Sequence, residues 1–472
     1  MGTEEKLRYW IERCADCDVC RTMLEEGCQM FPELFRLWDN EQETGTRITI
    51  DEMRHLIDLC NLCGICPCPE VPTSLMEAKT EFARRHGLPL RIRAIERVEL
   101  VGRFACAMPG ISNFLLQNSV TSGLIKAALG IHKDRKLPLF GKESLSDWIE
   151  NGMGSVFDAR TAKRKVAYFA GCSAQYYVPD VGKAVIDVLQ RNGVEIFVPE
   201  QKCCGMPPLL EGDRELALEL ARFNLDSLSQ AVEEGYEIVC SCPTCGFALK
   251  KLWKQGANYS PEFRAAAGSS ESDWENLLST PIELRTGQWF ARYGSQYIVR
   301  PLKDEGYFSG LNGLKRMSVA EHTYDLGEYL RNLHRAGELD VGFGDVDALS
   351  AYYPPCHLRE QEIGTPYTDL LSLIPGLHVE SIEGPFYCCG AAGIMGFKSD
   401  FHDVSIRMAE RLIERIRGIQ PEKLLTDCLG CRYQFNHLTP HEVCHPIEIM
   451  KQAYDNYRGK WGNKNFPTGK LS

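Results

Sequence analysis

The chain has 472 residues, a formal net charge of -11 at pH 7, 44% hydrophobic residues and 25% charged residues. These values are typical of a globular protein of several domains, and the negative charge argues against a general nucleic-acid binder. The 21 cysteines are the unusual number. The first residues, MGTEEKLRYW, show neither the basic start nor the apolar run of a secretory signal, so we expect a cytoplasmic protein whose cysteines bind metal or do redox work.

Residues 1–98 are expected to form a mainly helical, ferredoxin-like domain. They contain two C-x2-C-x2-C triplets, CADCDVC and CNLCGIC, and each can offer three thiolates from one tight loop to a [4Fe–4S] cube. In two-cluster ferredoxins the fourth ligand often comes from the other half of the domain. On that rule one cubane cluster takes Cys14, Cys17, Cys20 and Cys68, and the other takes Cys60, Cys63, Cys66 and Cys28. Zinc knuckles or buried thiols are the alternative, although two triplets exceed what tetrahedral zinc uses.

Residues 99–162 are expected to form a helical linker. Within residues 103–138 the apolar stretch FACAMPGISNFLLQNSVTSGLIKAALGI is followed by the basic end HKDRKLP. Pro109, Gly110 and Lys126 interrupt the stretch, so it does not predict a transmembrane segment. Packing between the neighbouring domains is the favoured interpretation, and docking on a membrane surface is the other.

The remaining cysteines reveal an internal repeat at a separation of about 185 positions, with units at 163–250 and 341–458. The distance from Cys172 to Cys203 is 31 positions, and from Cys356 to Cys388 it is 32. Each unit then has a second adjacent cysteine followed by glycine, and each ends in C-x2-C. The two sets are Cys172, Cys203, Cys204, Cys242 and Cys245, and Cys356, Cys388, Cys389, Cys428 and Cys431.

The segments between these cysteines predict α/β units with parallel sheets. RKVAYFAGC and ALSAYYPPC each begin as a buried strand that ends near the first cysteine, and EIVCSCPTC and KLLTDCLGC do the same at the last pair. Amphipathic helices at 213–235 and 400–418 follow the paired cysteines. Since ligands gather beyond the carboxyl ends of parallel strands, five thiolates can meet in each unit. Gly205 and Gly390 are expected to let the backbone approach a sulfide closely.

The two cysteine sets, together with FAGCSAQYYVPDVGKAV, CPTCGFALK and CCGAAGIMGFK, resemble the CCG domain found in the B subunit of heterodisulfide reductase. A ferredoxin-like segment followed by two CCG domains is similar to the D subunit of heterodisulfide reductase and to the C subunit of anaerobic glycerol-3-phosphate dehydrogenase. The resemblance implies two cubane clusters in the N-terminal part and a non-cubane [4Fe–4S] cluster in each CCG unit. It also implies a flavin dehydrogenase partner and a membrane quinone-reactive subunit, with peripheral association at the inner face of the cytoplasmic membrane. We assign no flavin to this chain, because no dinucleotide fingerprint stands out.

Several smaller features complete the prediction. Residues 251–340 are an insertion and connection, either a docking surface or a surface loop, and residues 459–472 are a C-terminal tail. Cys106, Cys240 and Cys444 lie outside the sets and are expected to be buried thiols, although Cys240 in CSCPTC is alternatively a spare ligand. His357 is the candidate for a catalytic group, because it follows Cys356 and can donate to cluster sulfur or shuttle a proton. A hydrogen-bonded loop histidine is the alternative.

These features predict an iron–sulfur electron-transfer subunit of an oxidoreductase, between a flavin-containing partner and a quinone or another carrier. A subunit that reduces or forms disulfides at a CCG cluster is the alternative function. A zinc-bound scaffold is the third, and metal analysis would separate it from the others.

Overall fold

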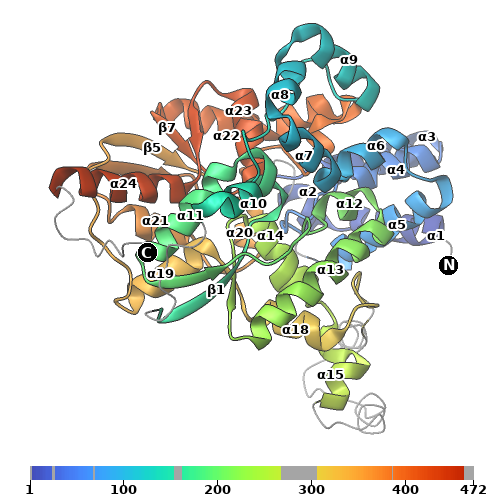
Figure 1. Cartoon of the computed structure of the whole chain (residues 1–472). Helices are drawn as coiled ribbons and strands as arrows, with labels where there is room; N and C mark the ends of the chain where they lie inside the picture. Colours follow the sequence, from blue (N-terminus) through green and yellow to red (C-terminus); the bar gives the residue numbers. More distant parts are fainter. Residues whose placement is uncertain are drawn as a thin grey trace.

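The computed structural model describes residues 3–23, 27–66, 68, 70–153, 162–266, 304, 306–384 and 386–461 of the chain. Figure 1 shows a helical N-terminal region beside two α/β units, with the second unit next to the first. Each unit holds a four-stranded sheet in which all strand pairs are parallel. The α/β class and the parallel sheets expected from the sequence are confirmed.

The N-terminal region is built from short helices that pack around a shared apolar core. The helices are α1 (Thr3–Ala15), α2 (Asp18–Met23), α3 (Met30–Thr44), α4 (Ile50–Asp58) and α5 (Glu70–His86). α4 begins at a capping box, in which the Thr49 hydroxyl accepts the Glu52 N–H and the Glu52 carboxylate accepts the Thr49 N–H. Phe31, Met53 and Ile57 are almost fully buried, so the helices hold the cysteine loops between them in fixed positions.

The predicted linker is helical, and its outer side is unusually apolar. It comprises α7 (Val98–Ala107), α8 (Pro109–Gln117), α9 (Ser119–Leu129) and α10 (Leu145–Trp148), and α6 (Leu90–Glu96) precedes it within the residues predicted as the ferredoxin-like domain. Figure 1 shows α8 and α9 projecting from the body of the molecule. Packing between domains accounts for the buried Ala105 and Cys106 of α7, but α8 has no buried residue. Packing therefore explains only the inner side of these helices.

The first sheet has the strand order β2-β1-β3-β4. Its strands are β1 (Arg164–Phe169), β2 (Val194–Phe197), β3 (Glu237–Cys240) and β4 (Thr323–Asp325). The helices around it are α11 (Pro179–Arg191), α12 (Met206–Glu211), α13 (Arg214–Glu233), α14 (Pro243–Phe247), α18 (Gly313–Glu321) and α19 (Leu326–Arg335). Residues Val166–Phe169 of β1 are fully buried, as expected for a central strand covered on both faces.

The strand β4 was not predicted. It lies in the segment 251–340, which therefore supplies a strand of the first sheet as well as a connection. Residues 267–303 and 305, which include most of the polar insertion, lie outside the described residues, as do residues 462–472 of the tail.

The second sheet repeats the first, with the order β6-β5-β7-β8. Its strands are β5 (Ala348–Tyr352), β6 (Leu377–Ser381), β7 (Lys423–Leu425) and β8 (Glu442–Cys444). The helices are α20 (Cys356–Arg359), α21 (Pro366–Leu371), α22 (His402–Ile419), α23 (Leu429–Leu438) and α24 (Pro446–Trp461). The equal strand order supports the duplication inferred from the cysteine spacing.

The two units share a continuous interface. The last helix, α24, packs on α11 of the first unit, where Arg191 lies over the ring of Tyr454 at 4.1 Å from its centroid. One buried apolar cluster runs from the N-terminal helices through the first unit into α24. Among the described helices, none combines the length and the apolar character needed to cross a membrane.

Candidate iron–sulfur sites

Cys68 lies with the first cysteine triplet rather than with the triplet that precedes it in sequence. Burial raises the pKa of Cys14 to about 12, and repulsion from the thiolates of Cys20, Cys68 and Cys17 adds to the effect. Burial likewise raises the pKa of Cys20 to about 11, with Cys17 and Cys68 as its charged neighbours. The geometry thus gathers the four sulfur atoms of the first predicted quartet, and their role as ligands stays a prediction.

The second quartet is gathered in the same crossed manner. Burial raises the pKa of Cys28 to about 12, and the nearest thiolates are those of Cys63 and Cys60. Cys66 has Cys60, Cys28 and Cys63 around it, and burial and repulsion raise its pKa too. The tight loop depends on left-handed backbone at Leu62 (φ 55°) and Gly64 (φ 71°). The N–H groups of Leu62 and Ile65 then donate to the sulfur atoms of Cys60 and Cys63.

The first CCG set meets past the carboxyl ends of β1, β2 and β3. The sulfur atoms of Cys172 and Cys203 lie 3.7 Å apart. Cys204 lies within hydrogen-bond reach of both Cys203 and Cys245, and Cys245 in turn reaches Cys242. Cys242 and Cys245 flank the start of α14, and the N–H of Met206 at the start of α12 donates to Cys204. The two paired cysteines and the terminal C-x2-C therefore converge, as predicted from the strand order.

The second CCG set is arranged in the same way. The sulfur atoms of Cys389 and Cys431 lie 2.9 Å apart, and the Cys428 sulfur accepts the Cys431 N–H at 3.4 Å. Cys388 accepts the N–H of Gly390 at 3.3 Å, and its thiol is hydrogen-bonded to Cys389. The thiolate of Cys356 is repelled by Cys389, which places the fifth cysteine with the other four.

The paired-cysteine loops require glycine for a reason that the sequence did not reveal. Gly205 and Gly390 have left-handed backbone, with φ of 86° and 77°. A Cβ at Gly390 would lie 2.1 Å from the carbonyl oxygen of Ser405 in α22, so the close approach is to a helix of the same unit. That these glycines also let the backbone approach a cluster sulfide stays a prediction.

The second quartet and the two CCG sets adjoin one another around one cavity of about 430 Å³. Cys242 of the first CCG set is within hydrogen-bond reach of Cys428 of the second. Cys356 interacts with Cys63 of the second quartet. Apolar residues of α7 and α9, including Val101 and Leu129, close the cavity on the linker side. The cysteines that line it are Cys28, Cys60, Cys63, Cys66, Cys172, Cys203, Cys204, Cys242, Cys245, Cys356, Cys388, Cys389, Cys428 and Cys431.

His357 lies at the meeting point of three of the cysteine loops. Its Nε2 is 3.2 Å from the carbonyl oxygen of Leu62, so this nitrogen carries the proton. Its Nδ1 is 2.9 Å from the Thr244 hydroxyl, which donates to it, and Phe247 stacks on the ring. Burial lowers the pKa of His357 and keeps the ring neutral. His357 is thus a hydrogen-bonded histidine in the short helix α20, and its catalytic role stays a prediction.

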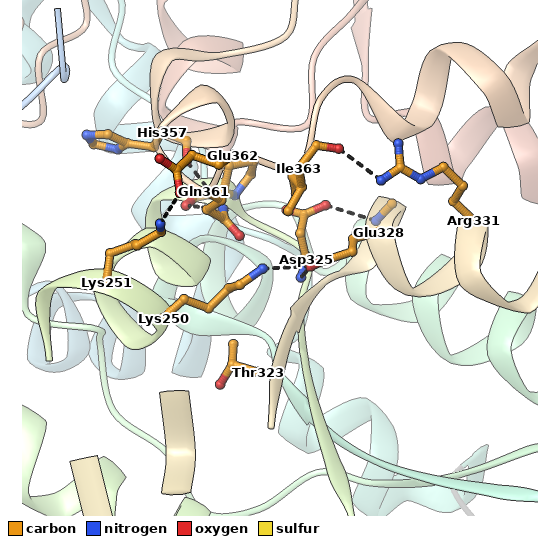
Figure 2. Close-up of polar contacts among 12 residues, drawn as sticks. Lys250, Lys251, Thr323, Asp325, Glu328, Arg331, His357, Gln361, Glu362 and Ile363 are labelled. Atoms are coloured by element: carbon orange, nitrogen blue, oxygen red, sulfur yellow. Dashed lines mark hydrogen bonds and ion pairs between the residues drawn. The ribbon is translucent and has the colours of Figure 1, made fainter. Parts of the chain in front are cut away.

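Polar contacts beside His357 fasten the two units together (Figure 2). The side-chain amide of Gln361 donates to the carbonyl oxygens of His357 and Pro243, at 3.3 Å and 3.1 Å. Lys251, which follows α14, donates to Glu362, which follows α20, at 2.6 Å. These contacts hold α14, which carries part of the first CCG set, against α20, which begins at Cys356.

Of the three remaining cysteines, Cys106 and Cys444 lie apart from the sets, whereas Cys240 lies near Cys204 and Cys242. The Cys106 thiol donates to the carbonyl oxygen of Tyr176, and the Cys444 thiol to Glu442. Cys240 is the last residue of β3, is fully buried, and has an elevated pKa because of that burial. All three are buried thiols, as expected.

Sequence reasoning missed the charged groups that approach the sites from distant segments. The Lys79 ammonium is buried and donates to the carbonyl oxygens of Cys60 and Leu210, at 2.8 Å and 2.9 Å. Arg135 of the linker is buried beside Cys389, and Glu99 of α7 accepts the backbone N–H of Cys203. No motif marks these residues, because each lies far along the chain from the cysteine it approaches.

The donor sets fit iron–sulfur clusters. Buried thiols crowded together resist ionisation, which a bound cation reverses, and backbone N–H groups already point at several sulfur atoms. None of the 21 cysteines, all of which lie among the described residues, forms a disulfide. Within the described ranges, no three His, Cys, Asp or Glu side chains converge closely enough to hold a single metal ion. Sulfur atoms spread around a cavity suit a polynuclear group better than a mononuclear one.

Two parallel sheets, each with five cysteines past its strand ends, define a protein built on two cysteine-rich units. The CCG family, described as Cysteine-rich domain, matches residues 166–250 and 350–436, so the chain carries two copies of the CCG domain. The chain is similar to the C subunit of anaerobic glycerol-3-phosphate dehydrogenase from Escherichia coli, at 26% identity over 77% of each chain. The resemblance inferred from the cysteine spacing is thereby confirmed.

Two further relatives cover smaller parts of the chain. The B subunit of fumarate reductase (CoM/CoB) from Methanothermobacter marburgensis is 25% identical over 62% of this chain and 47% of its own length. Lactate utilization protein A from Halalkalibacterium halodurans is 24% identical over 57% of this chain and 86% of its own length.

Proposed function

We propose that this chain is the iron–sulfur electron-transfer subunit of an oxidoreductase complex. The observation that carries the proposal is the order in which the four cysteine sets adjoin. Cys20 of the first quartet interacts with Cys66 of the second, and Cys63 of the second quartet interacts with Cys356 of the second CCG set. Cys428 of that set then reaches Cys242 of the first CCG set. Clusters bound at these sets would each take up and release one electron at a time.

The assignment of clusters follows the donor sets. The quartets Cys14, Cys17, Cys20, Cys68 and Cys28, Cys60, Cys63, Cys66 would each hold a cubane [4Fe–4S] cluster, and each CCG set would hold a non-cubane [4Fe–4S] cluster. Seven of the ten CCG cysteines are buried, whereas Cys68 of the first quartet is exposed, and backbone N–H groups orient several of the thiolates. Relatives named as subunits of a dehydrogenase and of a reductase support a partner subunit, for which a flavin dehydrogenase is our proposal.

Anaerobic reconstitution of the full chain tests the proposal. We expect about 16 irons per chain, four for each of four clusters. Cys204→Ser and Cys389→Ser, examined separately by paramagnetic resonance, should each remove the signal of one CCG site and leave the other. Cys106→Ser is the matched control, because this buried thiol lies outside the sets, and it should change neither the iron content nor the spectrum. Zinc in place of iron, or one signal lost in both variants, would contradict the proposal.

The shared cavity supports a second candidate function, the reduction of disulfides. Both CCG sets line the cavity, so a disulfide bound there would meet sulfur-bound iron on two sides. The reaction consumes two electrons and two protons, breaks the S–S bond and releases two thiols. Turnover of small disulfides by the reduced, reconstituted chain would favour this function, and inertness toward them would exclude it.

The outer face of α7–α9 supports peripheral association with an anionic membrane. Its most exposed apolar residues are Phe104, Met108, Ile111, Phe114, Val120 and Leu124, with exposed fractions between 59% and 71%. The flanking residues Arg91, Arg93, Arg97, Arg103, Lys133, Lys136 and Lys142 are all exposed, whereas Asp134 is the one exposed acid in the fully described segment 90–142. Apolar side chains among basic ones suit a bilayer that contains anionic lipid. Such a position would bring the cavity close to a membrane-bound quinone.

A further inference from the structure

Arg135 is a buried cation with incomplete hydrogen bonding. Arg135 is 1% exposed, and its guanidinium carbon lies 4.7 Å from the centroid of the Phe397 ring. Nη2 donates to the side-chain oxygen of Gln434. Among the described residues, Nε and Nη1 have no acceptor. A buried charge with two unused donors is costly, so a fold that retains it usually supplies an acceptor.

The surroundings of Arg135 belong to the second CCG set. The Gln434 amide donates to the Ser405 hydroxyl at 3.1 Å, and this hydroxyl donates to the carbonyl oxygen of Gly390 at 2.7 Å. Gly390 follows Cys389 directly, and Phe397 lines the same cavity as Cys389. The guanidinium also stabilises the Cys389 thiolate by charge. The Arg135 guanidinium therefore lies near enough to the second CCG set to act on it by charge, and Gln434 and Ser405 link it to the loop that carries Cys389.

The first CCG set is approached by a group of opposite charge from the same part of the chain. Glu99 of α7 accepts the Cys203 N–H and, at 2.9 Å, the Tyr176 hydroxyl. Burial raises the pKa of Glu99, whereas these two hydrogen bonds and the charges of Lys202 and Arg103 oppose that rise. The linker thus places an acid at the first set and a cation at the second.

We propose that Arg135 raises the reduction potential of the second CCG site above that of the first, so that electrons shared between the two sites reside mainly on the second. Added positive charge and hydrogen bonds to sulfur both stabilise the reduced, more negative form of a cluster. The contact between Cys242 and Cys428 lets the two sites exchange electrons, so the potential difference decides where an electron stays. This inference rests on the proposed function, since it presupposes iron–sulfur clusters in both sets.

Anaerobic redox titrations of the reconstituted full chain, followed by paramagnetic resonance, test the inference. Arg135→Gln removes the charge and should weaken one-electron reduction of the second CCG site at least tenfold, which is a fall of about 59 mV. The signal is assigned by its absence in Cys389→Ser. Arg135→Lys retains the charge and should lower the reduction potential of the second CCG site by less. If the glutamine variant fails to hold clusters, the lysine variant serves as the test. Lys136→Gln removes an adjacent but exposed charge and should leave the potential unchanged.

The outcomes separate this inference from the proposed function. Failure of the wild-type chain to bind iron would refute the proposed function, whatever Arg135 does. Suppose instead that the chain is fully loaded and the Arg135 variants leave the equilibrium constant for one-electron reduction of the second CCG site within twofold of wild type. That result would overturn the inference alone. So would a titration of the wild-type chain in which the first CCG site is reduced before the second.

Discussion

The Thr244 hydroxyl lies 2.9 Å from Nδ1 of His357, and this hydrogen bond joins the two CCG domains beside their cysteine sets. Thr244 lies between Cys242 and Cys245 of the first set, whereas His357 follows Cys356 of the second. The other nitrogen of the ring donates to Leu62, between Cys60 and Cys63 of the N-terminal region. One imidazole thus fixes the relative positions of three cysteine loops. The rate of electron transfer between the sets would depend on the distances between these loops.

His357→Phe should destabilise this junction without removing a ligand. The phenyl ring can still stack on Phe247, but the Leu62 carbonyl and the Thr244 hydroxyl lose their partner. Burying such groups unpaired costs about 1–3 kcal/mol. We expect this loss in anaerobic denaturant unfolding, with the iron content unchanged. His378→Phe on β6 is the control, because this histidine is exposed and should change stability by less than about 0.5 kcal/mol. An equal effect of the two substitutions would contradict the role given to His357.

The sequence predicted the parts of these sites that local patterns encode. The C-x2-C spacings and the buried strands before Cys172 and Cys242 follow from short stretches of chain, and the parallel sheet then brings the strand ends together. Strands β4 and β8 have only three residues each and were not predicted, whereas the equally short β7 was predicted because it leads directly into a C-x2-C pair. His357 was noticed because it follows a cysteine, but its partners Thr244 and Leu62 were not.

The residues that sequence reasoning missed act across long separations. Lys79 reaches Leu210, and Arg135 reaches Gln434, although 131 and 299 positions separate the members of these pairs. Nothing in the residues around a lone lysine or arginine distinguishes a buried donor from a solvated charge. The apolar outer face of α7–α9 is a different case, because the sequence marked the stretch as apolar but allowed both packing and exposure. Only the fold distinguishes these two interpretations.

The crossed quartets predict that substitutions of Cys28 and Cys68 affect different clusters. Cys28→Ser should remove the cluster held by Cys60, Cys63 and Cys66, because Cys28 lies among these thiols. Cys68→Ser should instead remove the cluster of the first triplet. Each variant should lose up to about four irons and a different signal in the paramagnetic resonance spectrum. The same signal lost in both variants would show that the quartets are not crossed.

Lys79 should matter more for stability than an exposed lysine in an ion pair. Its ammonium satisfies two carbonyl groups, one in the N-terminal region and one at the end of α12. Lys79→Met would leave both unpaired, and we expect a loss of about 2 kcal/mol in the free energy of unfolding. The control is Lys251→Met, because the exposed pair of Lys251 with Glu362 should contribute at most about 1 kcal/mol. Equal losses in the two variants would contradict this account.

The exposed face of α7–α9 predicts binding to anionic vesicles. The chain should sediment with vesicles of mixed phosphatidylcholine and phosphatidylglycerol, and high salt should weaken the binding. Phe104→Asp combined with Phe114→Asp should reduce binding at least tenfold, because charges replace side chains that are 71% and 64% exposed. Val341→Asp, at a remote position that is 54% exposed, is the control and should bind as wild type. Equal binding by the double variant and the control would place the membrane contact elsewhere or exclude it.

Acid should destabilise the fold through His437. Burial, together with the charges of Arg135, His402, Lys136 and Lys126, lowers the pKa of His437 to about 4. In the unfolded chain its pKa is about 6.5, so between these values the unfolded state binds a proton that the folded state does not. The stabilisation is therefore present above about pH 6.5 and is lost as the pH falls toward 4. Anaerobic denaturant unfolding at pH 7, 6 and 5 should show this fall.

His437→Gln should reduce the slope of the unfolding free energy against pH by up to one proton. Part of the slope should remain, because burial also lowers the pKa of His402, which this variant retains. The exposed His378→Gln serves as control and should leave the slope of the unfolding free energy against pH unchanged. A slope that His437→Gln does not alter would mean that the folded chain does not lower the pKa of His437, and would contradict this prediction.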